Sequence, residues 1–206
     1  MEPFEHLAEH HMDVLKEIGN IGAGHAATSL SLLLDRYVGM LVPRVSIVRF
    51  ESLSDCVGGP EQVVAAVYSR VSGEVSGHLF FLLSVESAKK MLKNFAGLDV
   101  APGDAYSEME RSALCEIGNI MTGSYLTSLA DLTKLTVHPS VPSFAVDMAG
   151  AILGHGALGY GAVSDCALLI DTKFVGGTKE VDSHFILLPD PESFAPLFGA
   201  LGVRIG

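Results

Sequence analysis

The sequence predicts an α+β fold: a single pseudo-two-fold-symmetric domain over residues 1–206, built from a duplicated half, with a largely antiparallel mixed sheet packed with helices. The first observation behind this prediction is a repeat, because the stretch EIGNI occurs at residues 17–21 and again, letter for letter, at 116–120. The second is that both copies show the same order of helix-like and strand-like segments. The third is that neither copy alternates strand and helix strictly, as a parallel doubly wound sheet would.

The repeat extends well beyond these five letters. At an offset of 99 residues, 13 of the 27 positions in residues 17–43 are identical to those in residues 116–142. Further along, residues 78–92 resemble residues 184–198 at an offset of 106. The second copy therefore contains about seven residues more than the first.

The extra residues are most simply placed in the glycine-rich stretch 149–163. A period near 100 residues is too long for a solenoid, whose repeats are about 20–50 residues. We therefore interpret the chain as two copies of a half-domain, which span about residues 13–98 and 112–203.

The first copy begins with helical sequence. Apolar residues recur at helical spacing in residues 3–18, and a proline in the first turn suits a helix start. Gly19, Gly22 and Gly24 are expected to interrupt this helix, before residues 25–35 resume a second one. The second helix should end before the first strand, because the residue before a proline is pushed toward an extended conformation.

Three segments rich in β-branched and aromatic residues follow and are predicted as strands. They are residues 42–50, 62–72 and 77–84. An amphipathic helix is predicted over residues 85–98, and the polar residues 101–108 connect the two copies. Because the order then repeats, we expect strands from both copies to merge into one sheet.

Composition excludes several classes of protein. Hydrophobic residues make up 49% of the chain and charged residues 18%, so it can bury a substantial core. A net charge of −11 argues against binding to nucleic acid, which requires a basic patch. No stretch reaches the roughly 18 apolar residues of a spanning helix, and the acidic N-terminal segment does not resemble a signal peptide. We expect a cytoplasmic protein without membrane insertion.

The three cysteines, Cys56, Cys115 and Cys166, form no CxxC pair. An odd number without such spacing predicts buried or free thiols in a reducing compartment rather than a disulfide framework.

The repeated helix has one polar stripe. At about 100° per residue, Glu17 and Asn20 fall near Asp13 on a helical wheel, whereas Ile18 and Ile21 fall on a separate apolar arc. The apolar arc should face the core and the polar stripe should face outward. Glu and Asn three residues apart project side by side from adjacent turns.

The second copy has the same arrangement, with Ser112, Glu116 and Asn119 on one arc. Exposed polar positions change easily, because most surface substitutions alter stability by less than about 0.5 kcal/mol. Residues 31–41 and 130–140 have diverged almost completely, yet the outward Glu and Asn are unchanged. Packing explains retained isoleucines but not these two residues, so we interpret them as functional; the alternative is an ordinary solvated face.

Gly19 and Gly118 lie off the polar stripe. A glycine inside a helix costs about 1 kcal/mol relative to alanine. We expect both glycines to let a neighbouring backbone approach the helix closely.

Three other patterns have less support. Residues 19–24, GNIGAG, follow a helix rather than a strand, unlike a dinucleotide-binding loop. Residues 6–10, HLAEH, match an inverted zinc peptidase motif, but the corresponding residues 105–109 of the second copy do not, and no third zinc ligand is evident. Because no Ser or Cys lies in a recognisable nucleophile motif, covalent catalysis has no support.

Residues 13–43 and 112–142 resemble the signature of the CheC/CheX/FliY family of phosphatases in bacterial and archaeal chemotaxis. That signature is Asp or Ser, three residues, Glu, two residues, Asn, twenty-two residues and Pro. The matching residues are Asp13, Glu17, Asn20 and Pro43 in the first copy, and Ser112, Glu116, Asn119 and Pro142 in the second.

The resemblance spans essentially the whole chain and is to the CheC branch of the family. CheX proteins carry one motif in a shorter chain. FliY proteins add a flagellar-switch domain, and because no residues follow Gly206 in this sequence we do not expect a structural role in the flagellum.

The resemblance implies a substrate and a role for each motif residue. The substrate would be the phosphorylated receiver CheY, which carries an aspartyl phosphate and holds its own Mg²⁺. Glu17 and Glu116 would pair with the receiver's lysine, and Asn20 and Asn119 would position the attacking water. No cofactor or metal would be required from this chain. The chemistry is reasonable, because hydrolysis of an acyl phosphate depends mainly on positioning and electrostatics, and an amide both donates to and accepts from water.

A second interpretation is a non-catalytic regulatory module that sequesters phosphorylated CheY or regulates the receptor deamidase CheD, with which the CheC family is also associated. Residues 143–163, which have no counterpart in the first copy, are where we expect such a partner surface. The sequence leaves open whether the two sites are equal, since Asp13 corresponds to Ser112 and residues 22–23 differ from residues 121–122.

Overall fold

The computed structural model describes residues 9–100, 105–158 and 165–201. The strands are β1 (Gly39–Arg49), β2 (Val63–Gly73), β3 (Gly77–Ser84), β4 (Val137–Pro139), β5 (Ser143–Met148), β6 (Cys166–Gly176) and β7 (Lys179–Pro189). The α-helices are α1 (Glu9–Leu34), α2 (Leu53–Cys56), α3 (Val85–Met91), α4 (Glu108–Thr133), α5 (Ala149–Leu158) and α6 (Pro191–Ala200). A 3₁₀ turn, η1 (Phe50–Ser52), precedes α2, and a π-helical turn, η2 (Leu92–Ala96), follows α3.

One seven-stranded sheet runs through the molecule in the order β1-β6-β7-β3-β2-β4, and β5 also pairs with β2. Every strand pair among the described residues is antiparallel. The predicted α+β class with an antiparallel sheet is confirmed. None of the described helices combines the length and the apolar run needed to span a membrane.

The two copies of the repeat interleave in this sheet. β1 of the first copy pairs with β6 of the second, while β4 and β5 of the second copy pair with β2 of the first. β3 and β7 lie side by side in the middle, and Phe80 pairs there with Ile186, its own counterpart at the offset of 106. The pseudo-two-fold axis therefore passes through this residue pair, and the two copies share one sheet.

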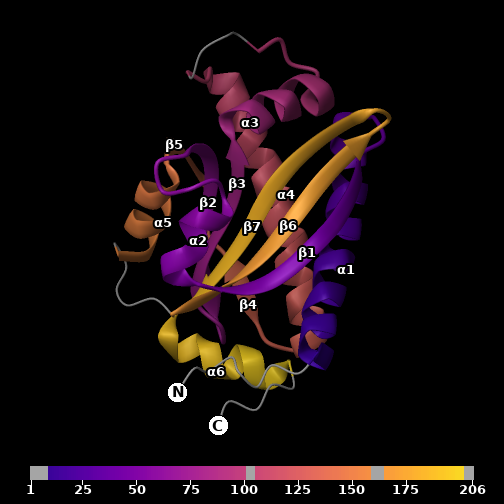
Figure 1. Cartoon of the computed structure of the whole chain (residues 1–206). Coiled ribbons are helices and arrows are strands. Elements are labelled where there is room, and N and C mark those ends of the chain that lie inside the picture. Colours follow the sequence, from indigo (N-terminus) through magenta and orange to yellow (C-terminus); the bar gives the residue numbers. More distant parts are fainter. Residues whose placement is uncertain (1–8, 101–104, 159–164, 202–206) are drawn as a thin grey trace.

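Helices cover both faces of the sheet (Figure 1). Because successive strand residues point to opposite faces, Phe81 faces the core under α1 and α4, whereas Phe80 faces a second core under α2 and α5. The larger core includes Leu15 and Ile18 of α1. These buried apolar residues attach the first long helix to the sheet.

The predicted interruption of the first helix was wrong. α1 continues without a break from Glu9 to Leu34, through Gly19, Gly22 and Gly24. Burial of apolar side chains on both sides of the glycines offsets their low propensity, since packing of an amphipathic face supplies most helix stability in proteins. Residues 3–8 of the predicted helix lie outside the described residues.

Gly19 and Gly118 do allow close approach, but the neighbours are side chains rather than backbone. A Cβ built on Gly118 would lie 2.6 Å from Cγ1 of Val67 on β2. A Cβ on Gly19 would lie 3.2 Å from Cγ2 of Val45 on β1. The expected approach of a backbone was therefore wrong, because valines from the sheet fill the space that each glycine leaves.

A third buried glycine joins α1 to α4. A Cβ on Gly22 would lie 2.5 Å from Cδ1 of Tyr125, so the tyrosine ring packs directly on the α1 backbone. The ring also stacks on Phe185, and its hydroxyl lies 3.2 Å from Oγ1 of Thr172. Burial raises the pKa of Tyr125 to about 12. The phenol is therefore neutral at physiological pH. Its contacts with Gly22, Phe185 and Thr172 fix the position of the two helices relative to the sheet.

A polar cluster attaches α6 to the hairpin of β2 and β3. Asp190, at the N-cap of α6, accepts two hydrogen bonds from Arg70 and one of 2.6 Å from the Ser76 hydroxyl. His78, which is buried, lies 3.6 Å from the same carboxylate and 3.0 Å from the Tyr68 hydroxyl. Burial, followed by the charge of Arg70, lowers the pKa of His78 despite the nearby Asp190.

Replacing Gly118 by alanine is expected to destabilise the protein by about 1–3 kcal/mol, the usual cost of overpacking a core. The new methyl group would collide with the buried Val67, since it would lie 2.7 Å from the Cβ of that valine as well as close to both of its methyl groups. Urea denaturation of Gly118→Ala and of Gly199→Ala, an exposed helix position with open space, measures the effect. Equal stability of the two variants would contradict the packing described here.

The lowered pKa of His78 predicts a loss of stability in weak acid. A histidine of the unfolded chain titrates near 6.5, and the folded His78 titrates below that. The unfolded state therefore takes up the proton first as the pH falls, so the contribution is complete above pH 6.5 and declines below it. Urea denaturation at pH 7.5 and 5.5 should show a smaller pH-dependent loss for His78→Gln than for the wild type.

Candidate functional site

The polar stripe of α1 faces outward. Asp13, Glu17 and Asn20 are all exposed, whereas Leu15 and Ile18 between them are buried. The helix is held by its apolar side against the sheet, so the stripe can only point away from the core. The wheel-based orientation of these three residues agrees with the structure.

The polar stripe of α4 has the same orientation. Ser112, Glu116 and Asn119 are exposed, and Leu114 and Ile117 are buried. The start of α4 is fixed by a capping box, in which the side chains of residues 107 and 110 bond reciprocally to each other's backbone amide. The molecule thus presents two separate carboxylate–carboxamide pairs on two helices.

The two motif prolines occupy equivalent breaks in the sheet. Pro43 is exposed at the irregularity of β1, where the pairing with β6 shifts register between Leu41 and Arg44. Pro142 lies between β4 and β5, where the second copy interrupts its pairing with β2. Proline cannot donate to a ladder, so it fits such a break. Val42, next to Pro43, contacts the helix at Gly19, which places this break beside the Asn20 turn.

α1 and α4 pack side by side and run in opposite directions (Figure 1). The two helices meet where the Tyr125 ring packs on Gly22. Asn20 lies before Gly22 on α1, and Asn119 lies before Tyr125 on α4. Because the helices run in opposite directions, the two carboxamides lie on opposite sides of this contact.

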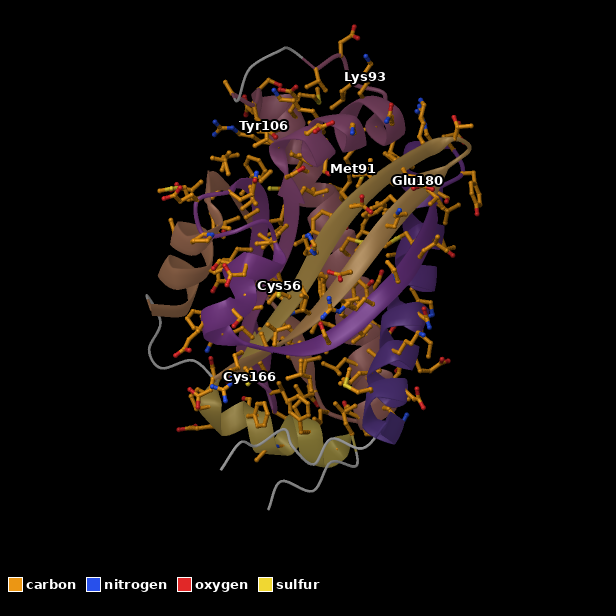
Figure 2. The ribbon with its side chains drawn as sticks, in the orientation of Figure 1. Cys56, Met91, Lys93, Tyr106, Cys166 and Glu180 are labelled. Carbon is orange, nitrogen blue, oxygen red and sulfur yellow. The ribbon has the colours of Figure 1, made fainter. Side chains whose placement is uncertain are left out.

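The thiols of Cys115 on α4 and Cys166 on β6 are not activated as nucleophiles. Burial, with a smaller contribution from the Glu116 charge, raises the pKa of Cys115. Burial, followed by the charge of Asp165, raises the pKa of Cys166 to about 11. All three cysteines are free, and Figure 2 shows Cys56 and Cys166 as separate side chains. A thiol with a raised pKa is protonated at neutral pH and is a poor nucleophile.

Within the part of the chain that the structure describes, no three His, Cys, Asp or Glu side chains gather as a metal site would require. The HLAEH pattern at residues 6–10 lies outside the residues whose side chains are described.

The sequence reasoning assigned no role to four further residues that share the stripes. Gly24 and Thr28 continue the α1 stripe beyond Asn20, and their counterparts Gly123 and Thr127 do the same on α4. The glycine and threonine are identical in the two copies. Three of the four are exposed and Gly123 is partly exposed. The sequence alone could have singled out these four residues, because they are identical in the two copies and lie at helical spacing on the stripes.

Comparison with known proteins identifies the family. The model of the CheC-like family matches residues 11–47 and 109–146, which contain both motif copies. The CheY-P phosphatase CheC of Bacillus subtilis (strain 168) is 39% identical over the full length of both chains. This chain belongs to the CheC-like family. A putative CheY-P phosphatase CheC1 of Halobacterium salinarum is 24% identical over 92% of this chain and 95% of its own length.

The similarity extends to FliY and, in the fold alone, to FliM. The flagellar motor switch phosphatase FliY of Bacillus subtilis is 31% identical over 66% of this chain but only 35% of its own length. The crystal structure of Thermotoga maritima FliY superposes with a TM-score of 0.73, at 19% identity, over 96% of this chain and 98% of that one. The middle domain of FliM from H. pylori superposes with a TM-score of 0.65 at 11% identity, over 93% of this chain and 99% of that one. These two structures show that FliY and the middle domain of FliM share the fold of this chain.

The exposure of the two asparagines predicts that they contribute little to stability. Asn20→Ala and Asn119→Ala are each expected to change the free energy of unfolding by no more than about 0.5–1 kcal/mol, with alanine favoured by its helix propensity. Thermal unfolding followed by circular dichroism measures this. A decrease well beyond 1 kcal/mol in either variant would mean that the carboxamide holds the fold.

Proposed function

We propose that this protein hydrolyses the aspartyl phosphate of the chemotaxis receiver CheY, with Glu17 and Asn20 forming one site and Glu116 and Asn119 forming the other. The single observation that carries the proposal is the pair of outward Glu–Asn stripes in a chain homologous to a CheY-P phosphatase over its whole length. All four side chains are exposed, so burial in the core does not explain their retention in both copies, which supports a role in recognition or chemistry.

The carboxamides of Asn20 and Asn119 are suited to position water. An amide oxygen accepts a hydrogen bond from the water while the amide nitrogen can donate to a phosphoryl oxygen. The water oxygen then bonds to phosphorus as the acyl phosphate P–O bond breaks, which gives the receiver's aspartate carboxylate, inorganic phosphate and a proton released to solvent. Positioning of this kind lowers a barrier by several kcal/mol without covalent participation by the enzyme.

Glu17 and Glu116 act as docking anchors in this proposal. Each lies one turn before its asparagine, where a carboxylate can pair with the lysine beside the receiver's phosphorylation site. The Mg²⁺ that neutralises the phosphoryl oxygens is held by the receiver and belongs to the substrate complex. The Glu and Asn of a motif therefore fix the receiver and the water relative to each other.

A binding role toward CheD is the second candidate, supported by the surface around β5. β5 pairs with β2 on one side, and Met148 at its end is exposed. An open hollow of about 660 Å³ lies beside it, between β5 and α5. Its lining includes Tyr68, Phe80, Ser143, Asp147, Ala151 and Ile152. This surface is separate from both Glu–Asn stripes, so binding there and catalysis can coexist.

The phosphatase activity is tested by the decay of phosphorylated CheY with Mg²⁺ present. Wild-type protein is expected to accelerate the decay catalytically. Asn20→Ala and Asn119→Ala should each retain part of the activity, and the double variant should lose at least about 100-fold, the scale of losing one positioned polar group in an active site. Gln62→Ala, which removes an exposed carboxamide away from both helices, is the matched control.

The single variants also show how the phosphatase activity is divided between the two Glu–Asn stripes. Complete loss in one single variant would mean that the other stripe is not catalytic. A folded wild type that leaves the decay rate unchanged, or a double variant as active as the wild type, would refute the proposed activity and favour the binding role. CheD binding would then be measured with Asp147→Lys as the variant on the β5 surface.

A further inference from the structure

Gly24 and Gly123 have no structural reason to be glycine. A Cβ built on either residue meets no described atom within 4 Å outside the backbone of its own helix. Neither has the positive φ that favours glycine. Both lie in the interior of 26-residue helices, where glycine is the least favourable residue apart from proline.

The other glycines of the same two helices show the contrast. Gly19, Gly22 and Gly118 are buried, and a Cβ on each would press on a valine or tyrosine. Packing therefore explains these three. The bare pair, Gly24 and Gly123, needs a different explanation, since each weakens its helix and no described atom fills the space that a Cβ would take.

The bare pair continues the two functional stripes. Gly24 lies one turn after Asn20, and Gly123 lies one turn after Asn119, at the spacing of four that keeps residues on one face. Each stripe thus reads Glu, Asn, Gly, Thr in chain order, and all four residues are identical in the two copies. Each glycine is retained together with the asparagine of its stripe. The candidate site therefore explains its retention better than packing in the core does.

The surface over this region is also hollowed. A depression of about 340 Å³ lies between α1 and α4, and its lining includes Gly123, Thr127 and His25. Residues of both helices line it, among them Ile120 next to Asn119 and His25 next to Gly24, although Gly24 itself does not. Space that the protein does not fill itself is available here to a docked partner.

We propose that Gly24 and Gly123 are docking positions for the phosphorylated receiver, kept without a side chain so that the receiver can lie against bare helix backbone one turn beyond the water-positioning asparagine. This inference rests on the proposed function. Glycine is the residue used where another molecule must approach a backbone closely. A methyl group at either position would hold the receiver away from the helix and weaken docking, although it would stabilise the helix itself.

Stability and activity are therefore expected to change in opposite directions in the Gly24→Ala/Gly123→Ala double variant. Its melting temperature should equal or exceed that of the wild type. Its KM for phosphorylated CheY should rise at least fivefold, with kcat within twofold. Its affinity for CheY loaded with Mg²⁺ and beryllofluoride, a mimic of the aspartyl phosphate, should fall by a similar factor. Gly199→Ala, at an exposed helical glycine of α6 with equally open space, should leave both KM and affinity unchanged.

Three results would overturn the docking role. One is a wild-type KM and affinity in the double variant. Another is a lower melting temperature, which would mean that the glycines serve the fold. The last is a fall in kcat at constant KM, which would place them in the chemistry. A wild type that does not accelerate the decay of phosphorylated CheY would instead refute the proposed function, and with it the docking role, so the wild-type assay separates the two failures.

Discussion

The contact between the Tyr125 ring and the bare backbone of Gly22 sets the geometry on which both candidate sites depend. It lets α1 and α4 pack closely in opposite directions, and the buried tyrosine hydroxyl ties the pair to β6 through Thr172. With the helix pair fixed, each apolar arc faces the sheet and each polar stripe faces solvent. Asn20 and Asn119 then lie on opposite sides of this contact. A side chain at residue 22 would push the two helices apart.

Because the strands interleave, residues of both copies support each Glu–Asn helix. α4 belongs to the second copy, yet its Gly118 rests on Val67 of the first copy. α1 belongs to the first copy, and a Cβ on its Gly19 would lie 3.7 Å from Ile170 of the second. Neither copy holds its own Glu–Asn helix on strands of its own alone. The duplication therefore produced one shared sheet with two related Glu–Asn helices rather than two independent half-domains.

The sequence was sufficient for features that depend on periodicity. The outward stripes follow from apolar spacing, because burial of one helix face determines them. The α+β class and the antiparallel sheet follow from an order of segments that does not alternate strictly between strand and helix. The break at Gly19, Gly22 and Gly24 was a wrong prediction, since about 1 kcal/mol per glycine is decisive only in an isolated helix. Their partners, such as Tyr125, are far away in the sequence and appear only after the helices pack.

The order of the strands in the sheet could not be predicted from the sequence either. The repeat predicted that strands of both copies would merge, but not that β1 would pair with β6 or that Phe80 would pair with its counterpart Ile186. Those pairings depend on contacts between distant segments. The short α2 within residues 50–56 was also missed, because four residues give no periodic signal. The structure was also needed to distinguish the buried glycines from Gly24 and Gly123.

The structure shows which sequence differences between the two Glu–Asn stripes are buried and which are exposed. Gly22-Ala23 and Met121-Thr122, the sequence difference closest to the asparagines, are all buried, so they adjust the packing of the helix pair rather than the docking surface. The difference at the head of each stripe, Asp13 against Ser112, is exposed on both helices. It gives the α1 stripe one more negative charge than the α4 stripe. If a lysine of the receiver docks at the glutamate, that charge favours the α1 site, and its effect should decline with salt because exposed charges are screened. An inequality that persists at high salt would have to come from the packing beneath the helices.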